Sequence, residues 1–430
     1  MSLIDNLKST LEKMESSGSF HFAHIESEVM EMLERAKQHV LDNPEPVFAI
    51  LRRIKPVLIV KNIALVTRFD DVQDVLVRDD IFQVTYGEKM RVVTGGNDFF
   101  LGMQNSPEYE RDTTHMRSVI RRSDIADVIA PFVANAAKSI VDSAAGGLDV
   151  VSQLGLVVPT RLVGAYFGTK PVSETDVAGW ASTIFQYLFT DLNNDPAVDA
   201  AARDASARTR AWLDDAIKEV KSRDASKRED TVLTRCLALQ AAGLPGMTDV
   251  DIRNNLLGLL VGAIPTTSKC CAQALDELLK RPAELAKAQV AARTGDDATF
   301  AQYVFEALRF HPNNPGVFRV AAEEYVVGKG QMHATRIPAG TSVLAATQSA
   351  MFDERVVESS KEFRIDRPAY NYMHWGVGLH TCFGQYINQV QIPGILKPLL
   401  QRGNLRRADG DAGTLKFAGP FPSSLGVQFD

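Results

Sequence analysis

The chain has 430 residues, of which 45% are apolar, and its net charge is −6. The apolar share is enough for a sizeable core, and the negative charge argues against nucleic-acid binding by bulk charge. No Gly/Ser linker, Pro-rich hinge or internal repeat divides the sequence. We therefore expect residues 1–430 to form one domain, although this length exceeds the usual size of a single domain.

The N-terminal segment predicts helices over residues 2–16 and 26–41 and lacks the apolar core of a signal peptide. No stretch gives a clean apolar span of about 20 residues, the length that a membrane helix needs. The four cysteines show no paired framework, which favours a reducing compartment. We expect a cytoplasmic protein without an integral membrane anchor.

Strands are predicted next, at 57–60 and 63–66, and then a short helix at 70–78. A polar, glycine-rich loop is expected over 86–110. The spacing of apolar residues then predicts a series of helices, at 115–145, 149–167, 173–191, 197–222 and 230–242.

A long apolar run at 252–279 predicts one long helix. Thr248 is a candidate N-cap, with Asp251 three residues on. Pro265 lies in the middle of the run. A proline there removes the hydrogen bond to the carbonyl of Val261 and should kink the helix.

A further helix is expected at 300–310, ending before His311 and Pro312. Glu306 and Arg309 lie three residues apart on it and share one face, so they can pair. Such a pair at a surface contributes only about 0–1 kcal/mol. Strands are expected beyond it near 318–327 and 342–347, and in pieces around 414–429.

The most specific motif is the stretch WGVGLHTCFG, residues 375–384, which contains Cys382. Three glycines frame this cysteine: Gly376, Gly378 and Gly384. Glycines allow tight turns and the close approach of a flat cofactor, and nearby N–H groups can donate to a thiolate that binds iron. His380 can reach an anionic edge of the same cofactor. A buried cysteine is more often a small core residue, but the combined spacing favours iron ligation.

This stretch resembles the haem-binding loop of the cytochrome P450 family, in which an aromatic residue, glycines and a basic residue surround the thiolate. Trp375 stands where phenylalanine is usual and keeps the aromatic shield. The resemblance extends from about Pro56 to the end of the chain. It implies a mainly α fold with a small β-rich lobe, a long central helix over the haem, and haem b as cofactor. A thiolate ligand favours O–O cleavage at such a haem.

The resemblance also assigns a role to the pair on the helix at 300–310. In the family, an E-x-x-R pair, here Glu306 and Arg309, locks the fold beneath the haem. A third partner comes from the segment before the Cys loop. Arg364 and Arg367 are the candidates, and Arg367 fits better because it precedes a proline.

The central helix of the family carries a small residue, a glycine, an acid and a threonine over the haem. The matching stretch here is GAIPTT, residues 262–267. The resemblance therefore places Ala263, Pro265 and Thr266 at the catalytic face. Pro265 replaces the acid, so proton delivery would depend on Thr266, water and freed backbone carbonyls.

Haem propionates need cationic or hydrogen-bonding partners, because a buried unpaired carboxylate is costly. The candidates implied by the resemblance are His380, Arg319, Arg117 and His115. The last two do not reproduce the family's spacing on their helix. His311, His333 and His374 are expected at surfaces or caps, as are His21, His24 and His39.

The predicted substrate pocket is apolar and aromatic, which implies a lipophilic small molecule. Its candidate residues are Val92, Phe99, Phe100, Phe185, Phe189, Ile264 and Val317. A fatty acid is the favoured substrate, and a terpenoid or other ring system is the alternative. Arg91 or Lys89 would anchor a carboxylate, unless they are ordinary solvent-facing charges.

The resemblance implies a monooxygenase that inserts one atom of O2 into a C–H bond. No flavin or NAD fingerprint occurs, so electrons would come from a ferredoxin or flavodoxin and its reductase. These would dock near Gln385, Lys361 and Arg364. We expect a monomer. The alternatives are a peroxide-driven peroxygenase, a hydroperoxide-rearranging enzyme and, in another class, a haem-binding sensor without turnover.

Overall fold

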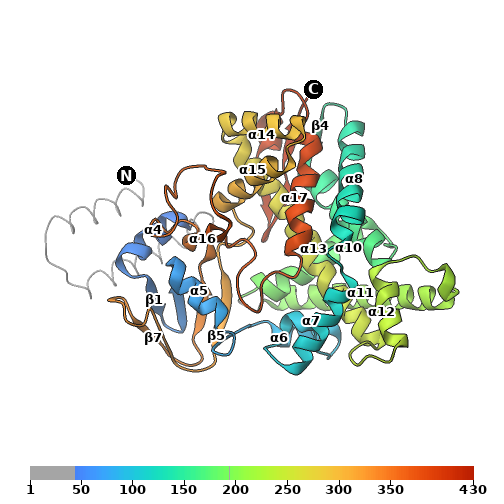
Figure 1. Cartoon of the computed structure of the whole chain (residues 1–430), viewed down its shortest axis with the longest axis horizontal. Helices are drawn as coiled ribbons and strands as arrows, with labels where there is room; N and C mark the ends of the chain where they lie inside the picture. The colour runs from blue at the N-terminus through green and yellow to red at the C-terminus, as the bar shows by residue number, and fades with distance from the viewer. Residues whose placement is uncertain (1–43, 193) are drawn as a thin grey trace.

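The structure is a computed structural model that describes residues 44–192 and 194–430. A small strand-rich lobe lies beside a larger body of helices (Figure 1). This arrangement confirms the expected mainly α fold with a β-rich lobe. The helices predicted at 2–16 and 26–41, with His21, His24 and His39, lie outside the described residues.

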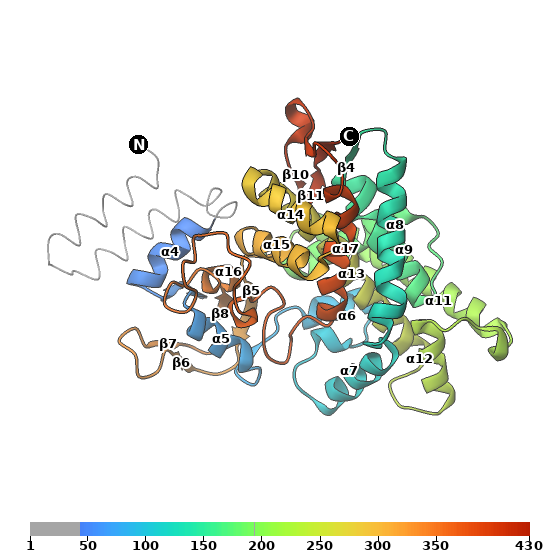
Figure 2. The same cartoon turned by 45° about the horizontal axis from the view of Figure 1, so that its top comes forward.

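The helical body is built from long helices, with the smaller helices α4, α5 and α16 in the lobe (Figure 2). The helices are α4 (Glu45–Ile54), α5 (Phe69–Val77), α6 (Gly87–Thr94), α7 (Pro107–Val119), α8 (Ala130–Ser143), α9 (Val157–Phe167), α10 (Glu174–Phe185), α11 (Pro196–Ser222), α12 (Val232–Ala241), α13 (Asp249–Leu279), α14 (Pro282–Thr294), α15 (Asp297–Phe310), α16 (Thr347–Ala350) and α17 (Gln385–Leu400).

The lobe contains a five-stranded sheet in the order β1-β2-β8-β5-β3. Only the pair β2 and β8 is parallel in this sheet. Smaller sheets pair β6 with β7, β10 with β11, and β12 with both β4 and β9. The strands are β1 (Val57–Val60), β2 (Ile63–Val66), β3 (Phe82–Gln83), β4 (Gly147–Asp149), β5 (Val317–Ala321), β6 (Tyr325–Val327), β7 (Thr335–Ile337), β8 (Ser342–Ala345), β9 (Arg406–Arg407), β10 (Lys416–Ala418), β11 (Phe421–Ser424) and β12 (Gly426–Gln428).

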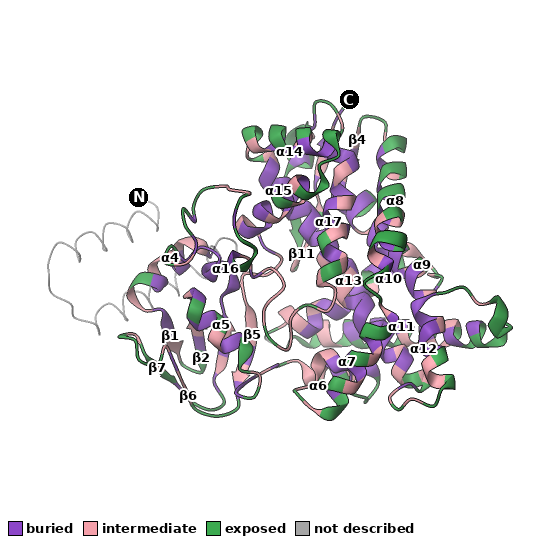
Figure 3. Cartoon of the chain, viewed as in Figure 1, coloured by how far each residue is buried: buried purple, intermediate pink, exposed green. Residues whose placement is uncertain are grey.

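Helix α13 runs through the middle of the helical body, and most of its residues are buried (Figure 3). Its start confirms the predicted cap. The Thr248 hydroxyl accepts from the Asp251 N–H at 3.2 Å, and the Asp251 carboxylate accepts from the Thr248 N–H at 2.9 Å. The helix continues through Pro265 to Leu279. Gly258 lets it pack closely, because a Cβ there would lie 2.1 Å from the ring of Phe99.

Two sequence predictions in the first half of the chain were partly wrong. The segment 86–110 is not a simple loop, since it contains α6 and the start of α7. The helix predicted at 115–145 is interrupted between Val119 and Ile125. Asp124 lies in the break, where its carboxylate accepts from the buried guanidinium of Arg235 and from the Tyr166 hydroxyl. Tertiary pairing of this kind overrides local helix propensity.

Two further differences occur in the second half. The predicted strand at 318–327 is two strands, β5 and β6, which pair with different partners. Helices α14 and α17 were not predicted. Helix α17 carries Pro393 and Pro398 in its interior, residues that normally argue against a helix. Burial of its apolar side chains offsets that disadvantage.

One window of the described residues, Val150–Phe167, is long and apolar enough to cross a membrane. However, 67% of it is buried inside the protein. Its residues belong to the largest core cluster of the helical body. This position is typical of a core helix.

Candidate active site

The loop before α17 depends on glycine at two positions. Gly376 and Gly378 have φ angles of +67° and +81°, which residues with a Cβ rarely adopt. A Cβ at Gly378 would also lie 2.6 Å from the carbonyl oxygen of Leu76. The loop is closed by the Cys382 N–H, which donates to the Trp375 carbonyl at 2.8 Å. The sequence thus bends back so that Cys382 lies just before the start of α17.

The thiol of Cys382 faces open space inside the protein. Its side chain is exposed, yet burial within the surrounding protein raises the pKa of the thiol, and the backbone N–H of Gly384 acts in the opposite direction. Cys382 is thus accessible to a molecule the size of water although protein surrounds it. Both observations are explained if its thiol borders an opening inside the protein. A Cβ built on Gly376 would also meet no atom within 4 Å, so there is open space beside this part of the loop as well.

Helix α13 has one open side in an otherwise buried environment. Gly262, Ala263 and Thr266 are half-buried, whereas Ile264 and Pro265 are buried. A Cβ on Gly262 would meet nothing within 4 Å. The Thr266 hydroxyl donates to the carbonyl of Gly262, one turn back. Its oxygen lone pairs remain available to accept a hydrogen bond.

The next threonine has a different environment. Thr267 is buried, and its hydroxyl donates to the side-chain oxygen of Asn388 on α17 at 3.0 Å. The thiol of Cys271 lies 4.0 Å from the carbonyl of Ile392 on the same helix. These contacts hold α13 against α17. They bring the open side of α13 and the Cys382 loop to the same region of the molecule.

Glu306 and Arg309 form a fully buried ion pair, with neither side chain exposed. The guanidinium donates to both carboxylate oxygens, at 2.8 and 3.0 Å. It also donates to backbone carbonyls of Met351, Ser360 and Glu362. The pair therefore ties α15 to the segment that precedes the Cys loop.

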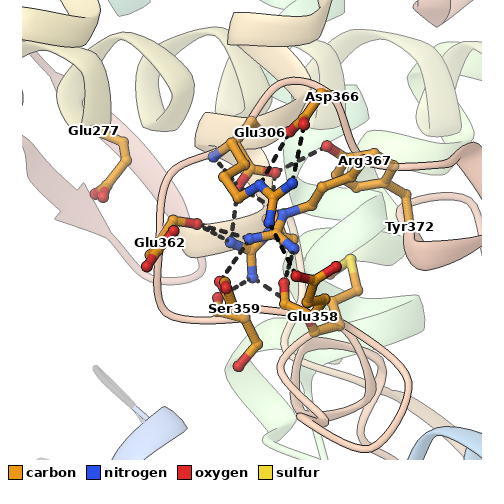
Figure 4. Close-up of polar contacts among 12 residues, drawn as sticks. Glu277, Glu306, Glu358, Ser359, Glu362, Asp366, Arg367 and Tyr372 are labelled. Atoms are coloured by element: carbon orange, nitrogen blue, oxygen red, sulfur yellow. Dashed lines mark hydrogen bonds and ion pairs between the residues drawn. The ribbon is translucent and has the colours of Figure 1, made fainter.

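Arg367, the preferred third partner, donates to Glu306 at 3.2 Å (Figure 4). Arg364 contributes its backbone N–H instead, which donates to the same carboxylate at 3.0 Å, while its guanidinium pairs with Asp366. Tyr372 completes the cluster, because its hydroxyl donates to Glu306 at 2.9 Å. Sequence reasoning missed Tyr372, since a lone tyrosine in an irregular segment gives no signal.

Two basic groups, Arg319 and His380, lie near the Cys loop, and no carboxylate among residues 44–192 and 194–430 forms an ion pair with either. Arg319 on β5 is buried, and its guanidinium donates to the carbonyl of Phe318 at 2.8 Å. Burial, together with the nearby charge of Arg319, lowers the pKa of His380 to about 4. The Nε2 atom of His380 is buried without a hydrogen-bond partner. This arrangement is unfavourable unless an anion lies between the two groups.

The two propionate-binding candidates on α7, Arg117 and His115, differ in exposure and in surroundings. Arg117 is exposed and lies within electrostatic reach of Tyr109. The ring of Tyr109 is 5.7 Å from that of His380, and its hydroxyl donates to the carbonyl of Leu379. His115 is half-buried with an unpartnered Nδ1. Tyr109 itself therefore connects α7 with the Cys loop, and Arg117 lies near that connection.

These residues fit a haem. The accessible thiol can ligate iron, and the open space in front of Gly376 and Gly262 leaves room for a flat ring. The basic pair Arg319 and His380 can bind propionates, which would give both buried groups an anionic partner. Trp375, whose ring packs edge-on against Phe305 at 5.9 Å, holds the start of the loop in place.

The predicted pocket residues separate into two groups. The rings of Phe185 and Phe189 pack in a tilted arrangement at 4.6 Å. Tyr86 lies 4.7 Å from Phe189, and Phe421 lies 5.3 Å from Phe185. We refer to Tyr86, Phe189, Phe185 and Phe421 as the aromatic row. Sequence reasoning missed Tyr86 and Phe421, because no local pattern connects these distant segments.

The other predicted pocket residues lie elsewhere. Phe99 packs on α13, and Phe100 packs on Phe383 of the Cys loop at 5.3 Å. Both are fully buried core residues, as is Ile264. Val92 and Val317 are half-buried beside the two main core clusters.

Several charged or ring side chains have partners that the sequence did not indicate. Arg91 pairs with Asp98 at 2.6 Å, and Lys89 pairs with Asp191 at 3.1 Å. His333 contacts Asp71 at 2.8 Å. His374 is not a surface residue, because it stacks on Tyr372 and burial lowers its pKa to about 4.

A family model described as "Cytochrome P450" matches residues 196–416, just over half of the chain. A bifunctional dioxygenase (DOX)-epoxy alcohol synthase (EAS) of Pyricularia oryzae is 23% identical over 388 residues. That match covers 82% of this chain but 34% of the relative, so the chain spans about a third of that relative's length.

A second relative is similar over nearly its whole length. The putative cytochrome P450 133B2 of Xylella fastidiosa is 24% identical over 399 residues, 89% of this chain and 95% of the relative. Among solved structures, CYP164A2 of Mycobacterium smegmatis has a TM-score of 0.78 at 18% identity. The match covers 93% of this chain and all of that structure, and it supports the same fold.

Proposed function

The chain belongs to the cytochrome P450 family, and from this premise we propose that it is a haem-thiolate monooxygenase with Cys382 as the iron ligand. The observation that carries the proposal is the exposed Cys382 just before α17, a helix that packs against α13. Haem with a thiolate ligand supplies oxygen activation and O–O cleavage. The overall reaction inserts one oxygen atom into a lipophilic substrate and releases the other as water, consuming two electrons and two protons.

The chain's own residues have distinct parts in this proposal. His380, Arg319 and Arg117 would hold the propionates of the haem, and the cluster around Glu306 keeps the Cys loop in position. Thr266 accepts a hydrogen bond from a water that carries protons into the site. Pro265 leaves no carboxylate at the neighbouring position. The two electrons come from a separate ferredoxin or flavodoxin system, in a cytoplasmic setting.

Replacing the ligand tests the proposal. The reduced CO complex of the wild type should absorb at the position characteristic of thiolate ligation. Cys382→Ser should lose that band. Cys270→Ser is the matched control, since Cys270 is also on an element beside the site but is buried. An unchanged CO spectrum in Cys382→Ser would exclude Cys382 as the ligand.

A second candidate function is the rearrangement of a lipid hydroperoxide, which needs no external electrons. Two observations favour it: Pro265 occupies the position of the acid, and a relative carries the name epoxy alcohol synthase. The two functions differ in their oxygen source. Turnover with an organic hydroperoxide, without any reductant, that exceeds turnover with O2 and an electron donor chain would favour the second.

A further inference from the structure

Lys269 is a buried lysine in the middle of α13, one turn after Thr266. Only 8% of its surface is exposed. Within residues 44–192 and 194–430, no carboxylate is recorded in an ion pair with its ammonium group. The neighbouring thiol of Cys270 is neutral near pH 7, because burial raises its pKa to about 12. Lys269 is thus a buried cation without a counter-charge in the described chain.

Burying a cation without a counter-charge costs free energy of folding. Burial lowers the pKa of Lys269 to about 8, as expected for a desolvated ammonium. The ring of Phe421 is 6.0 Å from the ammonium, at the outer limit of a cation–π contact, which contributes about 0.5–2 kcal/mol. The effective cost of burying an ion is several kcal/mol. The ring therefore does not compensate for the missing anion.

His311 is a second basic residue near Lys269. It caps the end of α15 and lies within electrostatic reach of Lys269. Burial lowers the pKa of His311, and the charges of Lys280 and Lys269 add to that effect. Asp276 and Glu277 act in the opposite direction.

Those two acids are already engaged. Asp276 pairs with Lys280 and with Arg407, each at 2.7 Å, and Glu277 pairs with Arg281 at 2.6 Å. Within residues 44–192 and 194–430, the ion pairs of these two acids are with Lys280, Arg281 and Arg407, and none is with Lys269. The surroundings of Lys269 and His311 therefore favour an external anion.

The hairpin of β10 and β11 connects this basic place with the aromatic row. Phe417 on β10 has its ring 6.4 Å from that of His311. The ring of Phe421 on β11 lies 6.0 Å from the Lys269 ammonium and 5.3 Å from the ring of Phe185. A basic group thus stands at one end of a row of apolar rings, which is the arrangement that a molecule with an anionic head and an apolar chain would fit.

We propose that Lys269, with His311 beside it, binds the carboxylate of a long-chain substrate whose apolar chain lies along the aromatic row. This inference rests on the proposed function and narrows its substrate to long-chain carboxylic acids. It also moves the anchor away from Arg91 and Lys89, since both of these have acidic partners.

The test uses the haem-loaded full-length protein and saturated C12–C18 fatty acids, with the methyl esters of the same acids as neutral probes. Binding is measured by calorimetry and by the spectral shift of the haem. We expect the wild type to prefer each acid over its ester. In Lys269→Met, acid affinity should fall about tenfold or more, the typical effect of losing a hydrogen bond to a charged group, while ester affinity should be unchanged.

Lys89→Met is the matched control and should keep the preference for the acid. Lys269→Arg should restore part of it. An equal affinity for acid and ester in the wild type would overturn the proposal, as would an unchanged preference in Lys269→Met or no binding of any acid. The CO spectrum of each variant separates these outcomes from a failure of haem-thiolate function.

The wild type alone provides a second measurement if Lys269→Met does not fold. A lysine with a pKa of about 8 is charged below that value. Binding a carboxylate raises this pKa, so affinity is full below pH 8 and falls as the pH rises through 8, by at most about tenfold per unit. Ester binding should not change over the same range. A flat acid profile between pH 7 and about 9.5 would contradict the role of Lys269.

Discussion

Thr266 and Thr267 are neighbours in sequence but have different contacts. The Thr266 hydroxyl donates within its own helix, to the Gly262 carbonyl, on the open side of α13. The Thr267 hydroxyl is buried and donates across to Asn388 on α17. Because the hydrogen of Thr266 is already donated, its oxygen serves the site as an acceptor. The contacts therefore assign proton handling to Thr266 and helix packing to Thr267.

Thr266→Val should lower the yield of product per electron pair by about threefold to tenfold, which is the range that one hydrogen bond of about 0.5–1.5 kcal/mol gives. The electrons that are lost should appear as hydrogen peroxide. Product and peroxide are measured together under saturating electron donor. Thr267→Val is the control. It should cost about 1–3 kcal/mol of stability, since Asn388 loses a buried partner, and leave coupling intact. Intact coupling in Thr266→Val would move proton delivery elsewhere.

The sequence predicted the individual residues whose signal is local. The glycine-framed Cys382 and the E-x-x-R pair are contiguous motifs, and the resemblance identified them. Lys269 also gave a local signal, as a charge within an apolar run. The side chains that surround Lys269, however, could not be predicted from its local sequence. They include His311 at the end of α15 and Phe421 on β11, both more than 40 residues away in the chain. The aromatic row could not be predicted either, because its four residues come from distant segments of the chain.

At the scale of elements, the cluster around Glu306 joins α15 to the irregular segment before the Cys loop. One carboxylate receives two guanidinium groups, a backbone N–H and a tyrosine hydroxyl. The segment has little regular structure of its own. Its path to Trp375 and Cys382 is therefore held largely by these polar contacts.

Glu306→Gln should destabilise the protein by about 3–5 kcal/mol, because Arg309 and Arg367 would remain buried without a full counter-charge. Haem content should fall with it. Urea unfolding and the haem-to-protein ratio measure the two effects. Arg364→Ala is the control, since this residue contacts Glu306 through its backbone and pairs with Asp366 at the surface. It should change stability by less than about 1 kcal/mol. Wild-type haem content in Glu306→Gln would show that the cluster does not position the loop.

The starts of helices and the long amphipathic or apolar helices could be predicted from the sequence. The breaks within predicted helices, and a helix that contains prolines, could not. The cap at Thr248 and the helix over 197–222 follow from local chemistry. The break before α8 exists because Asp124 pairs with Arg235, 111 residues away. Helix α17 forms despite two prolines because its apolar side chains are buried in the core. Each exception reflects tertiary contacts that outweigh a local preference.

At the scale of the whole molecule, a net charge of −6 gives an acidic redox partner no general attraction. Docking would need a local basic site near the Cys loop. Lys361 and Arg364, the residues expected there from sequence, are paired with Glu354 and Asp366. Arg122 is exposed and lies 3.7 Å above the ring of Tyr386, at the start of α17. No carboxylate is recorded in an ion pair with Arg122 within the described part of the chain.

Arg122→Glu should therefore weaken electron delivery from an acidic ferredoxin. We expect the apparent association rate to fall about fivefold to tenfold at low ionic strength, because a rim charge acts mainly on the rate of encounter. The difference should shrink at about 1 M salt, where the screening length is about 3 Å. Stopped-flow reduction of the haem at several salt concentrations measures both effects.

Arg208→Glu on α11 is the matched control. Arg208 is also exposed and pairs with Asp204 in the same helix. Each variant replaces one positive charge by one negative charge, so both change the net charge from −6 to −8. A loss in Arg122→Glu alone would locate docking beside Tyr386 and the Cys loop. Equal losses in both variants would mean that the partner responds to net charge only, and equal wild-type rates would exclude Arg122 from the docking surface.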